Sequence, residues 1–333
     1  MNRLVVAALF GAVSAACSGE TLTAGADEPI RVYDVLLKEA AQWRPGKLPG
    51  SRPLTTEQVA AGTRPVSPSI TSLPAQNGVT VAGATGKVFT GRASPTAAAV
   101  GIQLAGAGSG YWVVPVGAAD PMNDGELQFG VTLDVSDGAP VGSQHLLFVA
   151  LDERGRAGTK FDQPLCIGPA IPDNLNACRP TIAPPTLVVS LAWDAPVDLD
   201  LQLVTPEGKL VDAKHPSTAS SSGDAGIPSP LPVDVGILDR DSNAGCVFDG
   251  HQREDLVFQD KPPKGHYLVY ANLFDSCGQG SVRFELTFHA SRAGKAPGTF
   301  QVVQTYETTG ELLALQENGG AGKGLFVTEF DSK

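Results

Sequence analysis

Acidic residues at two-residue spacing are the feature of this sequence with the clearest chemical meaning. In the segment WDAPVDLDLQLVTPEG, residues 193–208, the leucines at 199, 201 and 203 alternate as the buried face of a β-strand does. Asp198 and Asp200 then share the opposite face, where two negative charges repel each other. Either water screens these charges or a cation lies between them, and the second case makes this strand part of an ion site.

A second acidic segment has the same spacing. LDRDSN, residues 238–243, offers two carboxylates and an amide, and Glu254 or Asp255 follows a short loop later. Calcium takes about six to eight oxygen ligands at about 2.3 to 2.6 Å, which neighbouring strand ends can supply. We therefore predict a calcium site formed by Asp198, Asp200, Asp239, Asp241, Asn243 and Glu254. The alternative is that these residues cap turns and remain solvated.

The charge of the chain restricts its partners. Residues 187–290 hold 15 acidic and 7 basic residues, a net charge of −8 out of −11 for the whole 333-residue chain. Binding to nucleic acid requires a basic face, which this composition lacks. We therefore expect no nucleic-acid partner, whereas cations are compatible ligands.

Motifs of the common enzyme classes are absent or incomplete. In GAGSG, Ala107 stands two residues before Ser109, at a position where a nucleophile elbow needs glycine. GGAGKG, residues 319–324, has no Ser or Thr after Lys323, as a phosphate-binding loop requires, and the five histidines form no HExxH pair. The sequence thus favours a binding protein. Two alternatives stay open: a hydrolase whose carboxylates converge in space, and a purely structural envelope spacer.

The first residues have the layout of an export signal. MNRLVVAALFGAVSAAC has a positive charge at Arg3, an apolar run and small residues directly before Cys17. This ending resembles the lipobox of bacterial lipoproteins, in which the cysteine becomes the lipidated first residue of the mature chain, although Ser14 replaces the usual leucine. The resemblance implies attachment to a membrane through lipid, and we expect the protein in the cell envelope, at the outer membrane. An ordinary cleaved signal followed by an unpaired cysteine is the alternative.

The remaining four cysteines form an even set in an exported chain, which favours disulfides. Three pairings are possible. We predict the two local ones, Cys166 with Cys178 and Cys246 with Cys277, because each lies within one predicted domain or its adjoining loop. Zinc binding is the alternative, but no CxxC or His-x-x-x-His spacing supports it.

Glycine and proline are frequent, at 38 and 26 residues, which indicates many turns. Strict apolar alternation recurs at residues 100–104, 127–135 and 147–151, and again at 267–273 and 282–288. The pattern predicts an all-β chain with two antiparallel sandwiches in tandem. One short helix is also expected within residues 31–45, where an apolar stripe is formed by Val32, Val35, Leu36, Ala40 and Trp43.

Three segments of the acidic half follow one another in a recognisable order: LAWDAPVDLDLQLVTPEGKLV, then GILDRDSNAGC, then REDLVFQDKPPKGHYLVYANLF. Over about 100 of the 333 residues they resemble the YfaP-like family of bacterial β-sandwich domains. The chain departs from that family in a long insertion around Ser220 and in its cysteine pair. The resemblance implies an exported β-sandwich and no particular reaction. LLFVALDERGRAG, residues 146–158, resembles the end of bacterial immunoglobulin-like modules.

These observations predict five regions: 1–16, a signal peptide; 17–76, a lipidated tether with the short helix and a linker; 77–168, an immunoglobulin-like sandwich; 169–186, a linker; and 187–333, the YfaP-like acidic sandwich. We expect a cell-surface lipoprotein that acts as a binding or adhesion module for a protein or a glycan and is stabilised by calcium.

Overall fold

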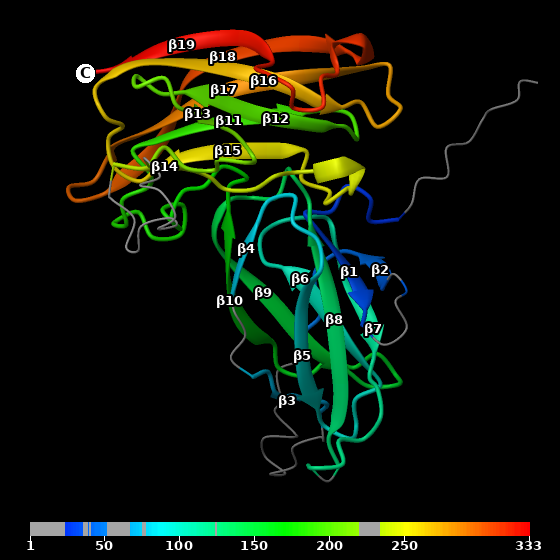
Figure 1. Cartoon of the computed structure of the whole chain (residues 1–333). Helices are drawn as coiled ribbons and strands as arrows, with labels where there is room; N and C mark the ends of the chain where they lie inside the picture. Colours follow the sequence, from blue (N-terminus) through cyan, green and yellow to red (C-terminus); the bar gives the residue numbers. More distant parts are fainter. Residues whose placement is uncertain are drawn as a thin grey trace, which may run out of the picture.

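The computed structural model is all-β, as predicted, and describes residues 24–35, 39, 41–51, 67–74, 78–123, 125–219 and 234–333. Its strands form four sheets, and each sheet draws its strands either from residues 30–168 or from residues 187–332. Figure 1 shows the second group of sheets above the first. The described part of the chain contains no helix long and apolar enough to cross a membrane.

The first group consists of a four-stranded and a six-stranded sheet that enclose one hydrophobic core. Phe89, Leu133 and Phe148 are fully buried in this core. The smaller sheet has the order β1 (Ile30–Asp34), β8 (Leu127–Val135), β5 (Lys87–Ala93), β3 (Ile70–Ser72). The larger has the order β2 (Gln42–Pro45), β7 (Gly110–Pro115), β6 (Ala99–Leu104), β9 (Gly142–Leu151), β10 (Phe161–Gly168), β4 (Val79–Val81), with only β10 and β4 parallel among these pairs.

The second group is a five-stranded and a four-stranded sheet around a separate core, in which Leu191, Leu199 and Tyr267 are buried. The five-stranded sheet has the order β14 (Gly236–Leu238), β15 (Arg253–Phe258), β11 (Leu187–Trp193), β17 (Ser281–Ala293), β18 (Phe300–Leu313). The four-stranded sheet has the order β13 (Leu210–Val211), β12 (Asp198–Val204), β16 (Gly265–Asp275), β19 (Leu325–Ser332). Two short 3-10 turns lie in loops of this group, η2 (Ala244–Cys246) between β14 and β15 and η3 (Ala314–Gln316) between β18 and β19.

The helix predicted within residues 31–45 is wrong: the segment forms strands β1 and β2. Ile30 and Val32 are buried while Arg31 between them is exposed, and β1 pairs antiparallel with β8. Trp43 of β2 pairs with Trp112 of β7. Pairing with the two existing strands decides the conformation, so a weak helical stripe is overridden by tertiary contacts. Two members of the stripe, Leu36 and Ala40, lie outside the described residues.

The first group of sheets therefore starts well before residue 77. Strands β1, β2 and β3 all come from the segment expected to be a tether and linker, and they pair with β8, β7 and β5. Between the two groups, residues 169–186 contact both. Asn174 donates a hydrogen bond to Gln259 (3.1 Å), and the Phe300 amide donates to the Pro180 carbonyl (2.7 Å). Cys178 is bonded to Cys166 of the first group. The signal segment and Cys17 lie outside the described residues.

The predicted disulfide pairs are both confirmed. Cys166 at the end of β10 is bonded to Cys178, and Cys246 in η2 is bonded to Cys277. The first closes a loop directly after β10, and the second joins two loops that flank the acidic cluster.

Candidate metal centre

Strand β12 places Asp198 and Asp200 as its sequence predicts, with the leucines in the core and the aspartates on the other face. Leu199 and Leu201 belong to the second core. Both aspartates are nevertheless buried, at 2% and 6% exposed. Little of either side chain is therefore exposed to bulk solvent.

A third carboxylate joins them from the turn after β14. Carboxylate oxygens of Asp198, Asp200 and Asp241 all lie within 4.8 Å of one another. They line a cavity of about 170 Å³. The rest of the cavity wall is formed by Gln202, Asp212, Ala213, Lys214, Ala244, Gly245, Phe274 and Gly320. Four acids from three segments, together with Lys214, thus line one small space.

Hydrogen bonds hold the carboxylates of Asp198 and Asp200 in place, but they do not satisfy every acceptor oxygen. Oδ2 of Asp198 accepts from the Gly245 amide (2.7 Å), while its Oδ1 is buried and has no hydrogen bond partner among the described residues. Oδ2 of Asp200 accepts from Asn272 (3.1 Å), and Asn272 in turn accepts from Asn318 (2.6 Å). A buried acceptor without a partner is rare in native proteins and is a sign of an ordered water or ion.

The ionisation of the cluster reflects its burial. Burial raises the pKa of Asp198 to about 6, and the charges of Asp241 and Asp275 add to this effect against the Gly245 hydrogen bond. Burial likewise raises the pKa of Asp200 to about 7, against the Asn272 hydrogen bond. The pKa of Asp241 is also raised, by burial and by Asp249. A bound cation would reverse these shifts because it stabilises the charged form.

Glu254, a predicted ligand, is fully buried, and both of its carboxylate oxygens accept hydrogen bonds from backbone amides. Oε2 accepts from the Leu201 amide (2.7 Å) and Oε1 from the Ser242 amide (3.1 Å). Its pKa is raised well above the usual value, first by burial and then by the charge of Asp200. Glu254 therefore joins β12 to the turn that carries Asp241, which makes it a positioning residue for the cluster.

Asp239 and Asn243, the other two predicted ligands, form hydrogen bonds and an ion pair that stabilise the turn, and they are not part of the carboxylate cluster. Asp239 pairs with Arg240 (2.9 Å) and accepts from the Asp255 amide (2.9 Å). Asn243 donates to the Val197 carbonyl (3.0 Å) and accepts from the Asp249 amide (3.2 Å). In the described residues, only three of the six predicted ligands meet in the carboxylate cluster.

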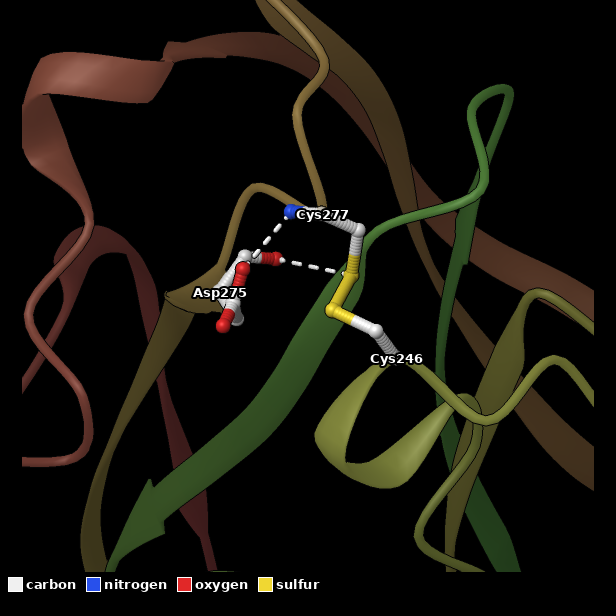
Figure 2. Close-up of side chains that lie close together, drawn as sticks. All are labelled: Cys246, Asp275 and Cys277. Carbon is white, nitrogen blue, oxygen red and sulfur yellow. Dashed lines mark hydrogen bonds between the residues drawn. A yellow bond between two sulfur atoms is a disulfide. The ribbon is translucent and has the colours of Figure 1, made fainter.

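The disulfide next to the cluster is drawn in Figure 2. Cys246 follows Gly245, the donor to Asp198, and Cys277 follows the end of β16. The Cys277 amide donates to the Asp275 carboxylate (2.7 Å). Although Cys246, Asp275 and Cys277 lie close enough to hold a metal, the two sulfurs are bonded to each other and are not available as thiolate ligands.

Sequence reasoning missed the polar residues that support the cluster. Gln202 continues the alternation of β12 and accepts from the Gly324 amide (3.0 Å), so its place on the outer face could have been inferred. Asn272 is predictable from the alternation of β16, but its pairing with Asp200 requires the register of the two strands. Lys214 follows β13 in a loop, and no sequence signal places it at the cavity.

Comparisons with known proteins add no assignment: a scan against protein-family models found no match, and neither did a search of curated proteins.

Proposed function

We propose that this chain is an exported, lipid-anchored binding protein whose second group of sheets binds calcium at Asp198, Asp200 and Asp241. The observation that carries the proposal is the Oδ1 atom of Asp198, a buried acceptor without a hydrogen bond partner among the described residues. The same side chain lines the cavity together with Asp200, Asp212 and Asp241. A divalent cation satisfies this atom and removes the repulsion among the three acids at the same time.

The chemistry of the donors favours calcium over other metals. The cluster offers carboxylate oxygens, which suit calcium, magnesium and manganese. Calcium tolerates irregular geometry and a mixture of carboxylates, carbonyls and waters, whereas magnesium demands a near-ideal octahedron. Three carboxylates do not fill the coordination shell of calcium. A cavity of about 170 Å³ has room for the waters that would complete it.

An envelope location is supported by independent features of the chain. The signal-like segment ends at Cys17, and two disulfides fit an oxidising compartment. We propose that this lipid-anchored module binds a protein or a glycan. The hydrolase alternative is less well supported, because the cavity at the carboxylates is below the roughly 300 to 1,000 Å³ of typical ligand sites.

Thermal unfolding of the exported protein tests the calcium proposal. If calcium binds only the folded chain, free calcium at about 100 times its dissociation constant adds roughly 2.7 kcal/mol to the free energy of unfolding. Tm should therefore rise with calcium and fall with a chelator, and Asp200→Asn should reduce the response. Asp260→Asn is the matched control, since Asp260 is an exposed acid at the other end of β15. Equal melting in millimolar calcium and in chelator would refute the proposal.

A further inference from the structure

The loop that completes the carboxylate cluster has an unusual backbone. Between β14 and β15, Asn243 and Cys246 have φ of 63°, and the Gly245 between them has φ of 57°. Cys277, the disulfide partner, also has a positive φ, at 49°. Left-handed backbone is uncommon for residues with a Cβ, so this conformation persists only where other contacts hold it.

The contacts that hold it converge on the metal centre. The Gly245 amide donates to Asp198, and Asn243 donates to the Val197 carbonyl directly before β12. Asp241, the third carboxylate, belongs to the same turn. On the other side, Cys277 follows Asp275, the residue that pairs with Asp198 in the β12–β16 register. The Cys246–Cys277 bond therefore connects the loop to the strand pair that carries Asp198 and Asp200.

We propose that the Cys246–Cys277 disulfide preorganises the cation site and that its reduction by a dithiol weakens cation binding. This inference rests on the proposed function. Without the bond, the loop is free to leave the left-handed conformation, and Gly245 and Asp241 move away from Asp198. Reduction proceeds by thiol–disulfide exchange: the dithiol is oxidised to its own disulfide, and Cys246 and Cys277 each gain a proton as free thiols.

The test compares two double variants of the full exported chain by calcium titration calorimetry. In the variant Cys246→Ser with Cys277→Ser, the calcium dissociation constant should rise at least about tenfold. This is the lower end of the loss in metal affinity that is usual when groups that orient metal ligands are removed. In the control, Cys166→Ser with Cys178→Ser, which removes the disulfide after β10, it should stay within about twofold of the wild type. Both titrations are run below the Tm that each variant shows in chelator, so that a general loss of stability does not affect the comparison.

Dithiothreitol supplies a second readout that needs no substitution at the site. Treating the control variant with this dithiol should release bound calcium to a fluorescent chelator as the single remaining disulfide opens. If the wild type binds calcium and the Cys246→Ser, Cys277→Ser variant binds it equally well, the inference is overturned while the proposed function stands. If the wild type binds no calcium, the proposed function fails first, and the inference fails with it.

Discussion

The ionisation of Asp198 and Asp200 is coupled to what lies in the cavity between them. Both carboxylates are buried by their own strand and by the turn of Asp241, and burial disfavours their charged forms. Without a cation the cluster lowers its energy by holding protons; with a cation it ionises. The same side chains therefore give opposite pH dependences in the two states.

We predict that the stabilisation of the protein by calcium grows as pH rises from 5 to 8. In chelator, the raised pKa values of Asp198 and Asp200 contribute stability below the unfolded pKa of about 3.9, and this contribution is lost as pH rises through about 6 and 7. Buried Asp255, whose pKa is raised to about 7, acts in the same direction. Tm in chelator should thus fall from pH 5 to pH 8, while the increase in Tm caused by calcium should grow over the same range.

Differential scanning fluorimetry across this pH range measures both quantities. Asp200→Asn should flatten the pH dependence of the calcium effect, because one proton-linked ligand is lost. A calcium effect of constant size from pH 5 to pH 8 would show that ion binding does not compete with protons at these carboxylates.

At the scale of elements, the edge strands of the first group come from an unexpected part of the chain. Strand β1 covers the edge of β8, and β2 covers the edge of β7. Open edges of a sheet invite pairing with other molecules, so these short strands also protect the larger ones. The segment that looked like an amphipathic helix is thus an integral part of the sandwich.

Replacing Val32 by alanine tests whether the segment around it is a buried strand or a surface helix. Val32 is fully buried and pairs with Leu133, so Val32→Ala should lower the free energy of unfolding by about 2 kcal/mol, from the lost apolar contacts and the cavity left behind. A surface helix would instead tolerate alanine, the best helix former. Arg31→Ala, at the exposed neighbour in β1, should change stability by less than about 0.5 kcal/mol. Urea unfolding measures both variants, and equal stabilities would contradict burial of Val32.

At the scale of the whole molecule, the proposed anchor and most of the net charge lie in different parts of the chain. The proposed lipid at Cys17 is 13 residues before β1, whereas the net charge of −8 is concentrated in residues 187–290. An anionic membrane surface repels acidic groups, and this effect falls off within a Debye length.

Lipid attachment is predicted to depend on Cys17 alone. Cells grown with labelled palmitate should incorporate label into the wild type and lose it in Cys17→Ala, which should be recovered without the membrane because one residue carries the acyl chains. Cys166→Ser with Cys178→Ser is the control and should keep the label. Equal label in Cys17→Ala and the wild type would contradict this prediction, whereas no label in either protein would favour the ordinary cleaved signal followed by an unpaired cysteine.

Much of this protein follows from its sequence, because the decisive patterns are local. Alternation of apolar residues marks β12, β16 and β17, since successive side chains of a strand point to opposite faces. The same rule puts Asp198 and Asp200 on one face. The disulfide pairs were also predictable, because both link cysteines that are near each other in the chain.

Only the tertiary structure decided which partners these residues meet. Asp241 reaches Asp198 because Glu254 on another sheet holds the amides of Leu201 and Ser242, and no spacing in the sequence encodes that bridge. Asp239 and Asn243 share the spacing of Asp241, yet hydrogen bonds within the turn occupy them. The segment of β1 could have formed a helix, but the free edge of β8 offered backbone hydrogen bonds and a buried place for Val32. Long-range contacts of this kind depend on strand order and register, which a local pattern does not determine.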